Sequence, residues 1–502
     1  MDIFVITDLL LSMEASMIVS TKYGKLEGFL QEGVLLFRGI PYAKPPVGKF
    51  RFLPPREMTP WSGIRECKQY GHAAPQISVP GLSKLEPGEE PDEDCLYLNV
   101  TTPSLSGEHP VLFWIHGGAF QKGSSTLGID PVSFAKEGIT VVSANYRLGA
   151  LGFLDVSGIL GDSYAQSGNN GLLDILAALR WTRDCIASFG GDPNHVTIMG
   201  QSAGAKITST LTVMKEARGF FTNAVMCSGS LQCVRDKETA LAIADRFMEN
   251  TGININNGSR LLTMSWPEIL KAQTPLATGL NLHTFGPVMD GIHLAQKEIL
   301  SQIPPKEDFH YHLLMGTNRD EMNLYRYIYH VRSLEEPLAY QLFGTRAPRV
   351  LQEYERIPKD KNFMENFIHF MTRLLYQSPC IRMAEEETIK GQDVYLYQLD
   401  WDRQHFKACH ASETQFLMGQ GGVIQDVDSS PAHELLKKQM RGSFLQFIKT
   451  GRPSFPSLPQ WNAFTTEKRE MLIFDAPCHI ESCPPLTDLI DMPYELFHLV
   501  QS

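Results

Sequence analysis

One ten-residue segment, residues 196–205, restricts the fold of this chain more than any other. It reads Val-Thr-Ile-Met-Gly-Gln-Ser-Ala-Gly-Ala, an apolar run followed by a serine with a glycine two residues to either side. The pattern predicts a buried strand, a sharp turn at Ser202 and a helix from 203 to 214, because glycines at these positions let neighbouring backbone approach closely. A serine at such a turn exposes its hydroxyl and is a candidate nucleophile. The Gly-x-Ser-x-Gly motif also arises by chance in a chain with 40 glycines. Other parts of the sequence must therefore support the interpretation of Ser202 as a nucleophile.

Composition narrows the possible classes of protein. Hydrophobic residues make up 43% and charged residues 20% of the 502 residues, as in ordinary globular proteins. The net charge of -11, without a Lys/Arg cluster, argues against a nucleic-acid partner. No apolar run reaches eighteen residues, so no membrane span is expected. Nine scattered cysteines without Cys-x-x-Cys spacing indicate neither a zinc site nor a disulfide framework, and predict a cytoplasmic protein.

The first sixteen residues differ in character from the rest. Their apolar run is interrupted by Asp8 and preceded by Asp2, where a secretion signal carries positive charge. We therefore expect residues 1–16 to be a disordered extension and residues 17–502 to form a single domain.

Strand-length apolar runs and helical patterns alternate along the chain. The runs lie at 111–115, 139–144, 196–199, 223–227, 312–315, 394–399 and 471–474. Strands that are apolar throughout are covered on both faces, and helical periodicity over 172–183 supplies one of the covering helices. The order predicts an α/β fold with a large, mostly parallel sheet flanked by helices.

Three further features complete the expected architecture. Residues 18–42 alternate and turn as in an N-terminal β-hairpin. Residues 236–300 and 333–389 are rich in helix formers, and we expect them to form helical insertions over the strand ends. Proline-rich loops at 41–55 and 75–91 should lie on the surface, with the acidic run 89–94 exposed.

A serine nucleophile needs a base, an acid that orients the base, and backbone donors for the oxyanion. The sequence His-Gly-Gly-Ala-Phe at 116–120 directly follows the predicted strand 111–115. Its two glycines free the backbone to direct N–H groups at a carbonyl oxygen. Gly117, Gly118 and the amide of Ala203 are therefore the predicted oxyanion-binding groups.

Several longer segments resemble the type B carboxylesterase/cholinesterase family, and most of all its bacterial para-nitrobenzyl-esterase-type members. They are FRGIPYAKPPVG at 37–48, EDCLYLNV at 93–100, NYRLG at 145–149, GNNGLLD at 168–174 and FGGDP at 189–193. The likeness covers nearly all of the N-terminal half and thins to short anchors after residue 236. It implies an α/β-hydrolase fold.

The same resemblance implies the remaining two catalytic residues. The family places its triad glutamate in a Gly-Thr-x-x-Asp-Glu pattern, which Gly-Thr-Asn-Arg-Asp-Glu at 316–321 matches, so Glu321 is the expected acid and Asp320 its rival. The family's base lies in a His-x-x-Glu pattern, which places the role on His410 rather than on His405 or His433. The order serine, glutamate, histidine is that of α/β-hydrolases.

The implied activity is that of a serine carboxylesterase acting on small-molecule esters of short to medium chain length. It needs no metal or organic cofactor, and the protein is expected to be a monomer or small homo-oligomer. A lipase is a rival reading, although the acidic residues at 86–94 do not suit an apolar lid. A binding protein that keeps the fold but lacks catalysis is a second rival, which the presence of all three triad residues opposes.

Other matched positions are expected to be structural. Arg51 with Glu93, and Arg147 with Asp174, resemble ion pairs of the family. The Ser-Gly-Ser segment at 228–230 is expected to pack behind the nucleophile and not to act as a second one.

Two departures from the family pattern bear on the site and the compartment. Gln201 stands where many relatives carry glutamate, which removes one buried charge beside the nucleophile. In secreted relatives Cys95 forms a disulfide with the cysteine of a Cys-Pro-Gln segment, but residues 73–76 of this chain read Ala-Ala-Pro-Gln. This absence favours a reducing compartment, although Cys67 is an alternative partner for Cys95.

Overall fold

The computed structural model describes nearly all of the chain from residue 17 to residue 490. The described ranges are 17–77, 85–231, 234–276, 284–327, 346–358, 361–403, 405–419 and 430–490, with isolated positions between them. The predicted disordered extension, residues 1–16, lies outside these ranges.

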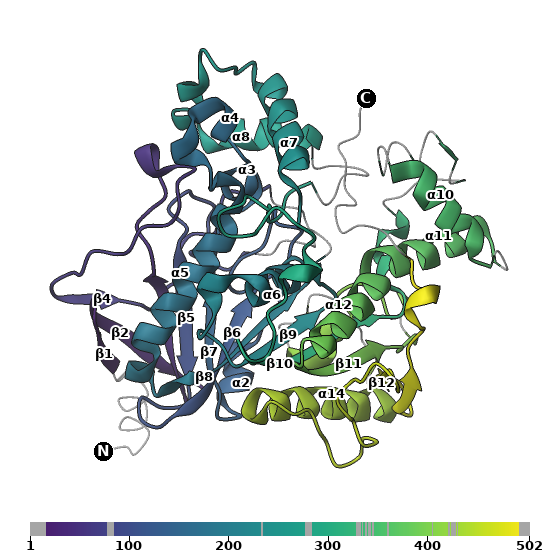
Figure 1. Ribbon diagram of the computed structural model, residues 1–502. Coiled ribbons are helices and arrows are strands. Elements are labelled where there is room, and N and C mark those ends of the chain that lie inside the picture. The colour runs from purple at the N-terminus through teal and green to yellow at the C-terminus, as the bar shows by residue number, and fades with distance from the viewer. Residues whose placement is uncertain are drawn as a thin grey trace, which may run out of the picture.

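A single large sheet organises the described residues (Figure 1). Its strands are β1 (Met17–Thr21), β2 (Gly24–Gln31), β3 (Val34–Pro41), β4 (Ile64–Glu66), β5 (Tyr97–Thr102), β6 (His109–Ile115), β7 (Thr140–Ala144), β8 (Gly191–Gln201), β9 (Asn223–Cys227), β10 (His312–Asn318), β11 (Asp393–Leu399), β12 (Glu470–Phe474) and β13 (His479–Ser482). The order is β1-β2-β3-β5-β7-β6-β8-β9-β10-β11-β12-β13, with β4 beside β2. Neighbours from β7 to β12 pair in parallel, and the other neighbours in this order pair antiparallel. The additional strand β4 pairs in parallel with β2. The predicted parallel strands and the N-terminal hairpin are confirmed.

Helices cover both faces of the sheet (Figure 1). The helices are α2 (Pro131–Ala135), α3 (Gly149–Phe153), α4 (Ser157–Leu160), α5 (Asn170–Cys185), α6 (Ala203–Val213), α7 (Lys237–Thr251), α8 (Trp266–Gln273), α10 (Ala347–Arg356), α11 (Phe363–Thr372), α12 (Ser378–Ile389), α13 (Glu413–Leu417) and α14 (Pro431–Thr450). Helices α5, α6 and α12 pack on one face, and α2 and α14 on the other. Within the described residues, no helix combines the length and the apolar character needed to cross a membrane.

The strand β6 shows why its sequence is apolar throughout. Val111, Phe113 and Ile115 belong to the core beneath α5 and α6, whereas Leu112 and Trp114 belong to the core beneath α14. Successive side chains of a strand point to opposite faces, so a strand with two covered faces has no position for a polar residue. This is the pattern from which the sheet was predicted.

Both stretches expected to form helical insertions contain helices. Helices α7 and α8 lie in the first stretch, and α10, α11 and α12 in the second. Figure 1 shows α7 and α8 grouped at the top of the molecule and α10 and α11 at its upper right. The assignment of residues 17–502 to one domain stays a prediction.

The expected exposure of the acidic run 89–94 holds only for Glu90, because Glu89 is buried and Asp92, Glu93 and Asp94 are half-buried. Glu89 is fully buried, and its carboxylate accepts hydrogen bonds from Ser124 Oγ at 3.0 Å, Thr126 Oγ1 at 2.7 Å and the Glu86 amide at 2.9 Å. Hydroxyl and amide donors compensate the cost of burial. The loop is therefore anchored to the segment that follows the glycine loop 116–120.

A second buried carboxyl makes stability depend on pH. Glu387 in α12 is fully buried and accepts the Tyr311 hydroxyl at 2.7 and 2.9 Å, and burial raises its pKa to about 8. The folded state thus binds this proton more tightly than the unfolded state, and its contribution to stability falls as pH rises from about 4.5 to about 8, by up to about 1.4 kcal/mol per pH unit. We expect Glu387→Gln to be more stable than the parent at pH 8 and nearly equal to it at pH 4.5. Chemical denaturation at the two pH values measures the difference, and an equal difference at both would contradict it.

Candidate active site

The turn at Ser202 has the geometry expected of a nucleophile elbow. Ser202 links the end of β8 to the start of α6 with φ 58° and ψ -121°, a strained backbone for a residue with a side chain. A Cβ on Gly200 would lie 2.2 Å from the Gly204 carbonyl carbon, and one on Gly204 would lie 2.0 Å from the Ile115 carbonyl oxygen. Both glycines are therefore required by close backbone contacts, as the sequence predicted.

Three predicted residues from distant parts of the chain form one chain of hydrogen bonds. Ser202 Oγ lies 2.8 Å from His410 Nε2, and His410 Nδ1 lies 2.6 Å from Glu321 Oε2. A carboxylate can only accept, so Nδ1 carries the proton and Nε2 is free to accept the serine proton. All three residues are buried. The arrangement can deprotonate the serine hydroxyl and stabilise the imidazolium that results.

The backbone fixes the carboxylate of Glu321 in place. Glu321 begins the 3-10 helix η10 (Glu321–Tyr327), three residues after β10 ends at Asn318. The Asn318 amide donates to Glu321 Oε1 at 2.8 Å, and the His410 amide donates to the Glu321 carbonyl oxygen at 3.0 Å. Glu321 and His410 are thus held together by a main-chain hydrogen bond as well as by their side chains.

The rivals for these roles lie elsewhere. Asp320 forms an ion pair with Arg319 at 3.0 Å. His405 is exposed, and His433 packs between Trp401 and Phe416.

The glycine loop after β6 lies against Ser202. A Cβ on Gly117 would lie 3.2 Å from Ser202 Cβ, and one on Gly118 (φ 117°) would lie 1.9 Å from the Lys122 carbonyl oxygen. Ala119 and Phe120 both have positive φ, a strained arrangement of the kind found at functional sites. Ala203 is the first residue of α6, and the first amides of a helix have no partner within it. The loop and the start of α6 therefore lie beside Ser202.

Behind the hydrogen-bonded chain lies a polar network that the sequence reasoning did not assign. Glu413 is fully buried and accepts from Asn318 Nδ2 at 2.5 Å and from Ser228 Oγ at 3.3 Å. Burial, with the nearby charge of Glu321, raises the pKa of Glu413 to about 7. Ser228 therefore serves this network, which agrees with the prediction that it is not a second nucleophile. Asn318, Ser228 and Glu413 all lie in the family motifs around residues 316–321, 228–230 and 410–413, which could have indicated this network.

Tyr376 is a further neighbour of the site that no sequence pattern indicated. Its ring centroid lies 5.0 Å from that of His410, and Lys206 Nζ lies 5.7 Å from the tyrosine ring. Tyr376 is carried by a π-helical turn, η12 (Arg373–Gln377), between α11 and α12. Such turns are frequent at functional sites because they redirect a side chain without ending the helix.

Both expected ion pairs are present and buried. Arg51 binds both carboxylate oxygens of Glu93, with Nε at 2.7 Å from Oε2, and Arg147 binds Asp174 at 2.7 and 2.8 Å. Arg147 also donates to the Leu53 carbonyl at 2.7 Å. The first pair joins two loops, and the second joins the segment after β7 to α5.

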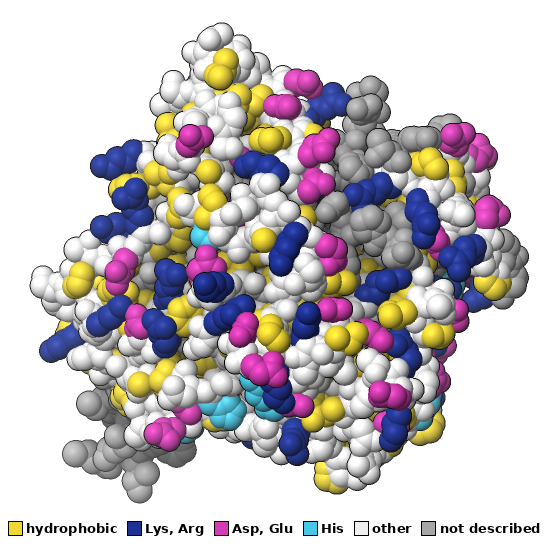
Figure 2. Space-filling view, in the orientation of Figure 1, with side chains coloured by type: hydrophobic (Ala, Val, Ile, Leu, Met, Phe, Trp, Pro, Cys, Tyr) yellow, Lys and Arg dark blue, Asp and Glu magenta, His cyan; other side chains and the backbone are white. Residues whose placement is uncertain are grey.

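The sulfur chemistry of the described residues is that of free thiols. Cys67 and Cys95 are both buried and unpaired, so the alternative disulfide between them does not form in the structure. Figure 2 shows acidic and basic side chains interspersed over the visible face, without the single-sign basic surface typical of nucleic-acid binding.

Comparison with known proteins agrees with this geometry. A sequence description of the carboxylesterase family matches residues 15–482. The para-nitrobenzyl esterase of Bacillus subtilis is 36% identical, over 93% of this chain and 96% of its own, and the phenmedipham hydrolase of Pseudarthrobacter oxydans is 32% identical, over 91% and 94%. The crystal structure of a Geobacillus stearothermophilus carboxylesterase superposes with a TM-score of 0.81 at 35% identity, over 93% of this chain and 98% of its own. The chain belongs to the carboxylesterase family and is a carboxylic ester hydrolase of the α/β-hydrolase fold.

Proposed function

We propose that ester hydrolysis proceeds through an acyl-enzyme on Ser202. His410 takes the serine proton as Oγ attacks the ester carbonyl, and then gives it to the leaving alcohol. Glu321 holds the imidazole in the required tautomer and stabilises its positive charge. The observation that carries this assignment is the pair of hydrogen bonds at 2.8 and 2.6 Å that joins the three side chains.

The tetrahedral oxyanion is assigned to the amides of Gly117, Gly118 and Ala203. Their support is the contact between Gly117 and Ser202 and the position of Ala203 at the helix start. Donors fixed before the reaction stabilise developing charge without reorganisation. Water then hydrolyses the acyl-enzyme with His410 again acting as base, so the proposed steps need no metal or organic cofactor.

The proposal also covers where the protein acts and in what state. A cytoplasmic location is supported by the free thiols of eight described cysteines, since oxidising compartments favour disulfides. We further propose a monomer or small homo-oligomer.

A fluorophosphonate probe tests the nucleophile directly. It should label about one serine per chain, because only an activated serine attacks such a probe. Trypsin cuts after Arg183 and Lys206 and separately after Arg218 and Arg235, so the peptide with Ser202 is distinct from the one with Ser228. We expect the mass increase on the Ser202 peptide, located by fragmentation. Labelling of the Ser228 peptide alone would refute the assignment.

A series of p-nitrophenyl esters tests the proposed substrate range. We expect kcat/KM to be highest for short to medium acyl chains, because Ser202 and His410 are buried. The exposed carboxylate of Glu90 also does not suit the apolar lid of a lipase. The measurement is initial rates at substrate concentrations below micelle formation. A maximum at long chains, with activation at a lipid interface, would instead identify a lipase.

A further inference from the structure

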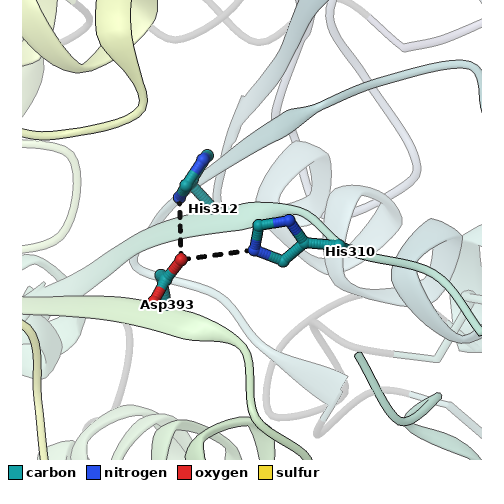
Figure 3. Close-up of side chains that lie close together, drawn as sticks. All are labelled: His310, His312 and Asp393. Atoms are coloured by element: carbon teal, nitrogen blue, oxygen red, sulfur yellow. Dashed lines mark hydrogen bonds and ion pairs between the residues drawn. The ribbon is translucent and has the colours of Figure 1, made fainter. Parts of the chain in front are cut away.

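A cluster of metal-binding side chains lies far from the candidate active site. His310, His312 and Asp393, which we call the strand-entry cluster, direct one nitrogen or oxygen each toward a common point (Figure 3). His312 and Asp393 are the first residues of β10 and β11, whereas Glu321 follows the opposite end of β10. Six residue steps of extended strand separate the two ends by about 20 Å.

The fold itself brings the three residues together. Parallel pairing of β10 with β11 places His312 directly opposite Asp393. His310 lies two residues before His312, and alternate residues of an extended segment face the same side. Tyr311 between them points the other way, into the core, where its hydroxyl meets Glu387. The orientation of both histidines is therefore fixed by a buried neighbour.

The two distances from the Asp393 carboxylate fit a small cation. Asp393 Oδ2 lies 3.2 Å from His310 Nε2 and 3.3 Å from His312 Nδ1, and all three atoms lie within 4.8 Å of one another. Zinc binds histidine nitrogen and carboxylate oxygen at about 2.0–2.2 Å with tetrahedral geometry, which separates neighbouring ligand atoms by about 3.3 Å. His312 Nδ1 is buried, and no described group forms a hydrogen bond of good geometry with it. We propose that the strand-entry cluster binds one divalent transition-metal ion of zinc type, with water completing the coordination.

The charges around the cluster determine how tightly it binds. In favour of binding, Asp393 supplies a negative charge directly opposite His312 at the start of β11. Against binding, Lys306 Nζ lies 3.6 Å from Asp393 Oδ2, and Arg452 also lies near His312. Lys306 is partly exposed and is free to move into solvent when a cation takes its place. The site is therefore one in which a lysine competes with the metal.

The metal would join two strands that carry the proposed chemistry at their other ends. Strand β10 leads to Glu321, and the segment after β11 leads to His410. An ion bound at the start of both strands adds a cross-link to the folded state only, and so raises the melting temperature. Because it lies about 20 Å from Glu321 along the strand, it takes no part in the chemical step.

Zinc titration of the chelator-treated protein tests the proposal, with Co²⁺ as a spectroscopic probe. We expect one zinc ion to bind the parent at this site, to raise its melting temperature, and to give tetrahedral Co²⁺ absorption. His310→Ala and Asp393→Asn should each weaken binding by at least about tenfold, since even indirect support of a ligand is worth that much. Both residues are partly exposed, so these variants should remain folded.

Lys306→Gln is the matched variant for which the opposite change in zinc affinity is expected. It removes the competing charge without touching a ligand, so zinc should bind several-fold more tightly. The amount of zinc bound by cysteines or other histidines would be the same in all variants, so it does not affect the difference between them. Equal affinity and equal melting shifts in parent, His310→Ala and Asp393→Asn would overturn the proposal, as would an equal response to Mg²⁺, which prefers oxygen ligands.

Discussion

Ser202→Ala is expected to lower kcat for a chromogenic short-chain ester by about 10⁵–10⁶-fold, the loss typical of removing a serine nucleophile. The variant keeps Cβ and the strained backbone of the elbow and loses only the atom that lies 2.8 Å from His410 Nε2. The remaining oxyanion donors can still bind the substrate, so a small rate above that of water is expected. Initial rates with parent and variant at equal concentration measure the loss.

Ser228→Ala is the matched control. Its hydroxyl is also buried and close to the site, but it donates to Glu413 at 3.3 Å and not to His410. Its loss in kcat should be smaller than that of Ser202→Ala by several orders of magnitude. Circular dichroism and melting temperature confirm that both variants are folded. A folded Ser202→Ala enzyme that retains turnover, or equal losses in the two variants, would refute the assignment of the nucleophile.

The parts of the site that could be predicted are those encoded by neighbouring residues. The elbow and the glycine loop follow local rules, because each depends on glycines beside a buried strand, and the structure bears this out in the contacts of Gly200 and Gly204. His410 lies 208 positions from Ser202 and 89 from Glu321. No local sequence pattern indicates that such distant residues meet, so Glu321 and His410 were predicted as acid and base from the family resemblance alone.

What could not be predicted depends on packing between distant segments. Tyr376 packs near His410 from a π-helical turn between α11 and α12, a local feature that no sequence pattern indicated. Glu89 belongs to an acidic run that was expected to be exposed, yet it is buried and accepts hydrogen bonds from hydroxyls of the segment after the glycine loop 116–120. The cost or gain of burying such a group is set by its partners, which its own sequence neighbourhood does not reveal.

Glu321→Gln is the second change with a large expected effect, a fall in kcat of about 10⁴-fold. The backbone N–H of Asn318 donates to Oε1 of Glu321, so the glutamine side chain must present its carbonyl oxygen at this position. Its NH₂ group then faces His410 Nδ1, where the carboxylate oxygen had accepted a proton at 2.6 Å. Nδ1 becomes an acceptor, the ring proton moves to Nε2, and the imidazole can no longer accept the proton of Ser202. The hydrogen bond from the His410 backbone N–H to the Glu321 carbonyl oxygen keeps the imidazole in place. If only the position of the ring mattered, Glu321→Gln would therefore lose little kcat.

Asp320→Asn separates this effect from the loss of a nearby charge. Asp320 is adjacent in sequence and carries the same charge, but its carboxylate pairs with Arg319 at the partly exposed edge of the turn. If the tautomer of His410 is what matters, Asp320→Asn keeps most of the activity while Glu321→Gln loses nearly all of it. Rates at saturating ester, together with melting temperatures, distinguish the cases. A severe loss in a folded Asp320→Asn variant with an active Glu321→Gln enzyme would reassign the acid to Asp320. A small loss in both would mean that His410 needs no carboxylate to hold its proton on Nδ1.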